Sequence, residues 1–254
     1  MFIDTHTHLY VKEFAEDIKS VIQTAVSEGV TQFYLPAIDS ESHDDMLRLE
    51  AQFPAHCIAM MGLHPCSVQA DTFEREMNLV ESHLALRKFV AIGEIGIDLH
   101  WDKSTLDLQI QAFTTQIEWA KAADRPIVIH ARKSMPEILP ILRKLKTSKL
   151  RGIFHCFGSS LRDAEECIDL GFMLGIGGVV TYPKAGLETV LQHIDLQHLV
   201  LETDAPYLSP VPFRGRRNSS AYIPIIAQKI AEIKGVTVAQ VAAATTANAV
   251  KIFA

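Results

Sequence analysis

The chain has only four cysteines and no excess of basic residues. None of the cysteines forms a C-x-x-C pair, so we expect reduced thiols and no disulfide framework. The formal net charge of −6 at pH 7 excludes a broadly basic surface that binds duplex DNA along its length. A phosphate-containing substrate must therefore be held by a local group of cations or by metal ions.

Long apolar runs and a basic leader segment are also missing. The chain begins Met1-Phe2-Ile3-Asp4, so we expect neither a signal peptide nor a membrane span and, by default, a cytoplasmic location. With 48% hydrophobic and 21% charged residues, the 254-residue chain can bury a substantial core. We therefore expect a single domain over residues 1–254, without a membrane partner or an obligate protein partner.

What the sequence does contain is a set of metal-ligand residues at the ends of short apolar runs. His6 and His8 follow the first run, and alternation along an extended segment points both imidazoles to the same side. The other members of the set, each at the end of a later run, are Glu94, His130, His155 and Asp204. Apolar runs separated by amphipathic helices are typical of parallel strands, so the set is expected to converge at the carboxyl ends of one sheet.

Eight such apolar runs alternate with helical patterns along the chain. They lie near residues 2–5, 33–37, 58–62, 89–94, 126–130, 152–156, 172–177 and 198–203. Eight alternating units predict a closed (β/α)8 TIM barrel with its site at the C-terminal ends of the strands. An open doubly wound sheet is the main alternative, but it collects a site from a few strands beside one switch point, whereas here at least five runs carry ligands.

Three of the predicted helices carry further signals. Residues 104–123 predict a helix in which Ser104 and Asp107 resemble a capping box. Two closing helices, about 219–234 and 237–252, are expected to pack on the barrel exterior.

Residues 205–218 contain prolines, glycine and arginines without a helix or strand period. Long structureless loops in compact domains are usually functional, so this segment is expected to contact substrate beside Asp204. Arg214 is its candidate substrate-binding residue, and Lys133 and Lys184 are further cations for a phosphate.

The six ligands are too many for one catalytic zinc, which normally keeps three protein ligands and an open position. Two ions bridged by a carboxylate explain the number, and Glu94 is the natural bridge because it can bind through both oxygens. Asp204 can ligate one ion and accept a proton from the attacking water, so Glu94 and Asp204 are the catalytic candidates. Mixed imidazole and carboxylate ligands suit Zn²⁺, Mn²⁺ or Ni²⁺, and Mg²⁺ remains open although it prefers oxygen.

Substrate contacts are predicted from position. His64 ends the third run and either meets substrate from the rim or has a structural role. Arg132 follows His130 by two residues, so it faces the same side and either binds two oxygens of a phosphate or forms a rim ion pair. Glu202 precedes Asp204 by two and is a candidate either for substrate binding or for orienting a ligand histidine.

Residues 158–160, Gly-Ser-Ser, open a predicted helix. Its free amides favour anions, but the same residues can simply cap the helix.

Together these motifs resemble the TatD family of metal-dependent deoxyribonucleases over essentially the whole chain. The segments that carry the resemblance are Phe2–Leu9, Gly62–Pro65, Gly93–Asp98, His130–Arg132, His155–Phe157 and Glu202–Leu208. The resemblance implies a (β/α)8 barrel that hydrolyses phosphodiester bonds in DNA with divalent metal, often from the 3′ ends of single strands. It implies the same six metal ligands as above, and it places His64 and Arg132 to meet the scissile phosphate.

Two segments depart from the family pattern. The family commonly reads H-C-F-S-G after the sixth strand, whereas here Gly158 and Ser159 stand in exchanged order. The usual R-G-x-x-N-E-P pattern appears as Arg214–Ser220 and lacks the acidic residue and the proline. Neither change touches a metal ligand, so we expect altered substrate preference rather than loss of catalysis.

Two other functions compete with a DNA phosphodiesterase. One is a metal-dependent ester or amide hydrolase, such as a D-aminoacyl-tRNA deacylase or a small-molecule amidohydrolase, because an activated water also attacks carbonyl carbon. Many related barrels use a carbamylated lysine at the fourth strand, where this chain has Glu94, which weakens the amidohydrolase version. The other is a non-catalytic binding module that keeps its ions for stability.

Overall fold

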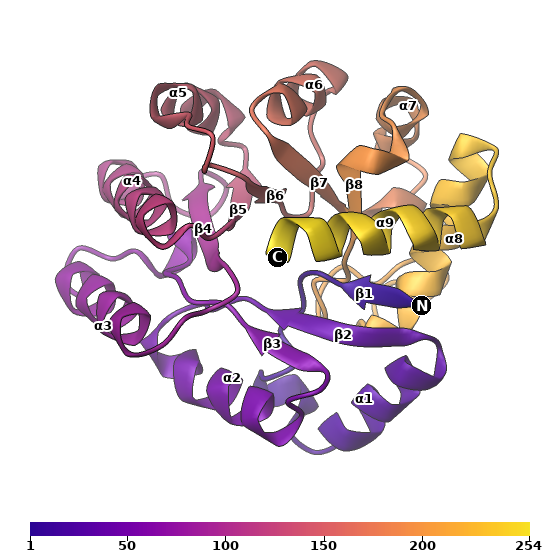
Figure 1. The fold of residues 1–254 in the computed structure, drawn as a ribbon, viewed down its shortest axis with the longest axis horizontal. Helices are drawn as coiled ribbons and strands as arrows, with labels where there is room; N and C mark the ends of the chain where they lie inside the picture. The colour runs from indigo at the N-terminus through magenta and orange to yellow at the C-terminus, as the bar shows by residue number, and fades with distance from the viewer.

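A ring of parallel strands with helices around it makes up the computed structural model, which describes residues 1–254 (Figure 1). The strands are β1 (Phe2–Asp4), β2 (Val30–Leu35), β3 (Cys57–Ala59), β4 (Ile92–Asp98), β5 (Ile127–Arg132), β6 (Gly152–Phe154), β7 (Phe172–Ile176) and β8 (Leu199–Leu201). The helices are α1 (Ile18–Ser27), α2 (Ser40–Gln52), α3 (Phe73–Leu86), α4 (Leu106–Ala123), α5 (Met135–Leu145), α6 (Leu161–Asp169), α7 (Leu187–His193), α8 (Ile223–Lys234) and α9 (Val238–Phe253).

The strands form two sheets, and backbone contacts at two places connect these sheets into a closed ring. Strands β1-β2-β3 form one parallel sheet and β4-β5-β6-β7-β8 form the other. A bridge between Met61 and Ile92 joins β3 to β4. The amide of Thr5 donates to the carbonyl of Leu201 at 3.0 Å, which joins β8 to β1. The predicted (β/α)8 barrel is therefore confirmed.

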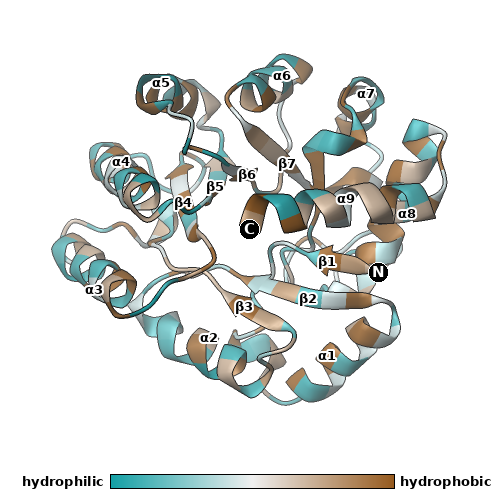
Figure 2. Cartoon of the chain, viewed as in Figure 1, coloured by the Kyte–Doolittle hydropathy of each residue, from teal (hydrophilic) through white to brown (hydrophobic).

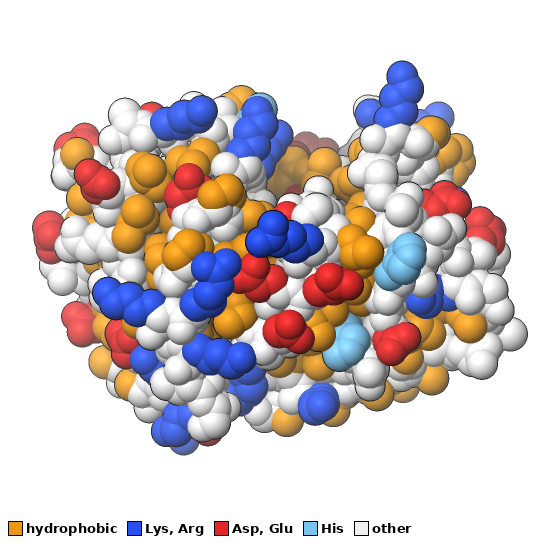
Figure 3. Space-filling model, turned by 90° about the horizontal axis from the view of Figure 1, so that it is seen from above, with side chains coloured by type: hydrophobic (Ala, Val, Ile, Leu, Met, Phe, Trp, Pro, Cys, Tyr) orange, Lys and Arg blue, Asp and Glu red, His pale blue; other side chains and the backbone are white.

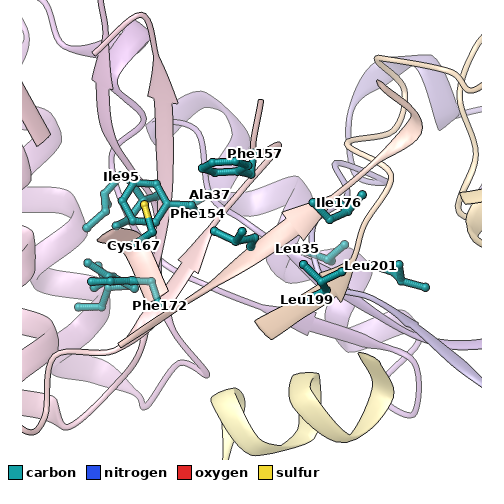
Figure 4. Packing of buried hydrophobic residues seen from close by; sticks show 14 of the residues in the cluster. Leu35, Ala37, Ile95, Phe154, Phe157, Cys167, Phe172, Ile176, Leu199 and Leu201 are labelled. Atoms are coloured by element: carbon teal, nitrogen blue, oxygen red, sulfur yellow. The ribbon is translucent and has the colours of Figure 1, made fainter. Parts of the chain in front are cut away.

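Helices α1 to α8 cover the outside of the barrel with their apolar faces turned inward (Figure 2). Between strands and helices lies one large apolar core, part of which is seen in Figure 4. There the ring of Phe154 in β6 meets the ring of Phe172 in β7 edge-on, with centroids 5.3 Å apart, and Cys167 of α6 lies beside them. The strands are thus buried on both faces, as their continuous apolar runs predict.

A second apolar cluster fills the barrel interior, with one residue from each strand or from the position next to it. It consists of Ile3, Tyr34, Met60, Ala91, Val128, Ile153, Met173 and Val200, together with Ala249, Ile252 and Phe253 of α9. The ring of Phe253 stacks on Tyr34 with centroids 4.1 Å apart. Helix α9 crosses the N-terminal mouth of the barrel, with the chain end near its centre (Figure 1). This arrangement leaves the opposite, C-terminal end of the strands for the site.

Two expectations about the helices are wrong. Helix α9 closes the barrel floor instead of packing on the exterior, because its apolar face finds the open interior layer rather than the outer surface. The predicted capping box at Ser104 does not form, because its hydroxyl donates to Asp102 at 2.7 Å instead of pairing with Asp107. No single helix has the length and apolar composition to cross a membrane; only the bent pair Ser220–Lys234 and Val238–Phe253 meets that criterion jointly.

Candidate metal centre

The two carboxylate oxygens of Glu94 face two different sets of imidazoles at the C-terminal ends of the strands. Oε2 lies 3.1 Å from Nε2 of His6 and 3.6 Å from Nε2 of His8, both of which follow β1. Asp204, just after β8, completes this set, because its Oδ1 lies 3.7 Å from His6 Nε2 and 3.5 Å from His8 Nε2.

The second set gathers around Oε1 of Glu94. His130 Nδ1 lies 2.8 Å away, and His155 Nε2, after β6, lies 3.6 Å away. His64, the rim candidate, belongs to this set as well, with its Nε2 3.2 Å from Oε1 and 3.3 Å from His130 Nδ1. The structure thus brings together all six predicted ligands and adds a fifth imidazole.

The electrostatics of the centre suit a bound cation. Glu94 is buried, which opposes its ionisation, but the surrounding histidines His64, His6 and His155 hold the pKa of its carboxyl well below the usual range. Burial, reinforced by the neighbouring His155, lowers the pKa of His6. Neither ring nitrogen of the buried His6 makes a hydrogen bond, although Nε2 faces the Glu94 carboxylate at 3.1 Å, and such a group is costly unless another group binds it. A divalent ion can bind such a nitrogen, so these imidazole and carboxylate donors fit the metal site that the sequence predicts.

Three of the histidines are oriented by a polar group on their other ring nitrogen. His8 Nδ1 lies 2.9 Å from the hydroxyl of Tyr10, which in turn donates to the carbonyl of Pro36. His130 Nε2 lies 2.8 Å from Oδ2 of Asp98, and His155 Nδ1 lies 3.0 Å from Oε1 of Glu202. Such partners fix the ring position and tautomer of metal-binding imidazoles.

Neither Tyr10 nor Asp98 was among the candidates from the sequence. Asp98 could have been found from the alternation Glu94, Gly96, Asp98, which places both carboxylates on one face of β4. Tyr10 lies outside any strand and carries no comparable signal.

Comparisons with known proteins match this chain along its length. The family model described as TatD related DNase matches residues 3–254. The chain belongs to this family. It is 36% identical to the uncharacterized metal-dependent hydrolase YabD of Bacillus subtilis, covering 100% of this chain and 99% of the relative. It is 34% identical to the 3′-5′ ssDNA/RNA exonuclease TatD of Citrobacter rodentium, covering 98% and 97%.

A solved structure has the same fold. The TatD homologue YjjV of Escherichia coli superposes with a TM-score of 0.90 at 30% identity, covering 99% of this chain and 97% of that one. These findings confirm both the predicted TatD resemblance and the prediction of a metal-dependent hydrolase.

Glu202 is placed to orient His155 rather than to contact a substrate. Its side chain is fully buried, and Oε1 also accepts a hydrogen bond from the amide of Cys156 at 2.6 Å. The carboxylate lies against β7 at Gly175, where an added Cβ would come within 2.2 Å of Oε2 and 3.2 Å of the Phe154 carbonyl. Of the two roles considered for Glu202, the geometry therefore supports the positioning role.

A buried aspartate ties the two ends of the ring together at the TatD-family site. Asp4 accepts hydrogen bonds from the amide of Thr203 at 3.0 Å and from its hydroxyl at 2.6 Å, and burial raises the pKa of Asp4 to about 7. Asp204, which follows Thr203, has a φ of 57°, in the left-handed region that L residues seldom occupy. Its amide donates to the His6 carbonyl at 2.9 Å, so β1 and β8 hold the ligands of one set in register.

A cleft of about 1180 Å³ opens from His130, His155 and Asp204 and runs between α5 and α6. Exposed Arg132, which makes no ion pair, and Arg162 are among the cations that line it. Figure 3 shows Lys and Arg side chains on both sides of a hollow at the upper edge of the face that it draws. The rim ion pair considered for Arg132 is therefore absent, and its guanidinium remains available for an anion.

The remaining candidates have mainly structural contacts. The guanidinium of Arg214 lies over the ring of Tyr182, 4.3 Å from its centroid, in a separate hollow with Lys184. It does not line the cleft that opens on the imidazoles, which disfavours the predicted substrate contact. Ser160 caps α6 by accepting from the amide of Asp163 at 3.2 Å, so residues 158–160 form the cap considered above rather than a free anion site.

Proposed function

We propose that the protein is a divalent-metal-dependent nuclease that hydrolyses phosphodiester bonds in DNA, acting from the 3′ ends of single strands. The observation that carries the proposal is the position of Glu94, whose two oxygens each face a separate set of ligand atoms. Two divalent ions bound there would activate a water molecule and neutralise the charge on a phosphoryl group.

The ligands divide between two ion positions. We assign His6, His8 and Asp204 to the first, and His130 and His155 to the second, with His64 next to the latter. Glu94 would serve both positions, because each of its oxygens faces one set. Each set contains at least two imidazoles, which favours Zn²⁺, Mn²⁺ or Ni²⁺ over Mg²⁺.

Asp204 is the proposed general base. Its side chain is 14% exposed, whereas those of His6 and Glu94 are 0% and 2% exposed, so it is the carboxylate of its set that faces the opening. There it can take a proton from the attacking water. Arg132, which lines the cleft, would bind the scissile phosphate through two oxygens.

The relatives and the charge of the chain support a single-stranded polynucleotide as substrate. One relative is named a 3′-5′ exonuclease of single-stranded DNA and RNA. The net charge of −6 disfavours extended duplex contacts, so a chain end that enters the local cleft is the better substrate. The four free cysteines fit the reducing cytoplasm, which we include in the proposal.

One experiment separates this function from its competitors. Metal-free protein is reconstituted with Mg²⁺, Mn²⁺, Zn²⁺ or Ni²⁺ and tested on end-labelled single-stranded DNA, duplex DNA, RNA and aminoacyl-tRNA, with Glu94→Ala as the blank. We expect stepwise shortening of single-stranded DNA from its 3′ end. Release of the amino acid from aminoacyl-tRNA without DNA cleavage would replace the proposal with the ester hydrolase, and metal binding without any hydrolysis would leave only a binding module.

A further inference from the structure

An exposed tryptophan stands at the edge of the metal centre. The side chain of Trp101 is 71% exposed, whereas the only other tryptophan, Trp119, packs partly buried against the core. The backbone amide of Trp101 donates to Oδ1 of Asp98 at 3.0 Å, and Oδ2 of the same carboxylate lies 2.8 Å from His130. The turn that presents the indole is therefore fixed to a histidine of the centre.

The indole also touches the proposed phosphate-binding arginine. The guanidinium carbon of Arg132 lies 5.3 Å from the centroid of the Trp101 ring, within the range of a cation–π contact. The imidazole of His100 meets the indole at 4.7 Å, and both His100 and Arg132 line the cleft. A planar apolar surface and a cation thus lie side by side at the entrance.

This pair of groups matches the two chemical parts of a nucleotide. Every nucleobase has a π face that stacks on an aromatic ring whatever the sequence, and each phosphate carries a negative charge. Sites for single-stranded nucleic acids combine such an aromatic side chain with cations that follow the backbone.

We propose that Trp101 is a stacking platform for the nucleobase next to the scissile phosphate, which Arg132 binds. The inference rests on the proposed nuclease function and deepens it, because a base-stacking residue gives the site a preference for nucleotides over other phosphate esters. Trp101 also restrains the Arg132 side chain, and that second role is what the experiment must separate from stacking.

The binding test uses the metal-loaded enzyme under conditions that prevent turnover. In the Asp204→Asn background loaded with Zn²⁺, the added change Trp119→Phe leaves Trp101 as the only tryptophan, so its emission can be excited selectively. Oligothymidylate is expected to quench its emission, because a stacked base covers the indole.

The affinity is compared in the Asp204→Asn protein that keeps Trp119. There, Trp101→Ala is expected to weaken oligonucleotide binding by about 5- to 150-fold, the range for one stacked base. Trp101→Phe keeps most of the affinity, and Leu86→Ala, at an exposed apolar residue of α3, leaves it unchanged.

An abasic nucleotide separates stacking from an effect through Arg132. Removal of one base near the 3′ end weakens binding to the protein that retains Trp101, and the same removal has little effect once Trp101 is Ala. Additive losses at every abasic position would overturn the proposal, because the tryptophan would then act only on the arginine.

The same experiments distinguish failure of this inference from failure of the proposed function. Normal DNA cleavage by the wild type, with no quenching and no loss of affinity in Trp101→Ala, would refute the stacking role and leave the nuclease intact. Absence of both binding and cleavage in the wild type would refute the two together.

Discussion

Substitution of one glycine should disable the metal centre without touching a ligand. A Cβ at Gly175 would lie 2.2 Å from Oε2 and 2.9 Å from Cδ of Glu202, far inside contact distance. The Phe154 carbonyl, 3.2 Å away, limits movement of the strand in response. In Gly175→Ala the carboxylate must therefore shift, and its contact of 3.0 Å with His155 Nδ1 is lost.

The size of the effect follows from the role of such partners. Loss of the group that orients a ligand histidine typically costs about 10- to 100-fold in metal affinity or activity. We expect Gly175→Ala to weaken Zn²⁺ binding, measured by calorimetric titration of metal-free protein, and to lower kcat on single-stranded DNA by a similar factor. KM should change little, because the substrate contacts at Arg132 are untouched.

Gly177→Ala is the matched control. A Cβ there meets the Glu202 carbonyl at 3.5 Å and Cγ at 3.7 Å, which are ordinary contacts, so binding and turnover should stay near wild type. The double variant Gly175→Ala/Glu202→Ala should be no worse than Glu202→Ala, because the clash and the orienting group disappear together. Unchanged metal affinity and kcat in a folded Gly175→Ala protein would refute the reasoning.

Three other variants test separate parts of the structure. Arg132→Ala should raise KM for an oligonucleotide by about tenfold or more with intact metal content, in steady-state assays, and an unchanged KM would remove its phosphate role. Phe253→Ala should lower the free energy of unfolding in urea by about 3–5 kcal/mol, because it empties the barrel floor beside Tyr34, and a loss below 1 kcal/mol would show that the floor is not packed as described. Burial opposes ionisation of Glu76, but hydrogen bonds from Ser40 hold the pKa of its carboxyl below the ordinary 4.5. Its stabilisation is therefore present above pH 4.5 and is lost as the pH falls through the folded-state pKa, so Glu76→Gln should flatten the acid side of the melting-temperature profile, whereas an unaltered profile would contradict that role.

The order of strands and the position of the centre could be predicted because both depend on local pattern. Apolar runs alone marked the eight strands, and a polar residue at the end of a parallel strand must lie at the same edge as the others. That is why His6, Glu94 and Asp204 could be grouped although almost 200 residues separate the first from the last.

Features that depend on contacts between distant segments could not be predicted in the same way. Helix α9 has an amphipathic pattern that fits either the barrel exterior or its floor, and only the barrel interior decides between them. A side chain is not tolerated at Gly175 because the Glu202 carboxylate, which follows β8, lies against it. The orientation of His8 depends on Tyr10, and no periodicity in the sequence identifies that tyrosine. Arg214 was assigned by its neighbourhood in sequence, whereas its contact with Tyr182 is set by the fold.

The number of divalent ions bound by each chain tests the central claim most directly. Elemental analysis and calorimetry on reconstituted wild-type protein should give two ions per chain, and Glu94→Ala should weaken both sites, because its two oxygens serve both sets of ligands. A single ion per chain, or a Glu94→Ala protein that keeps both at wild-type affinity, would contradict the bridged pair on which the proposed chemistry depends.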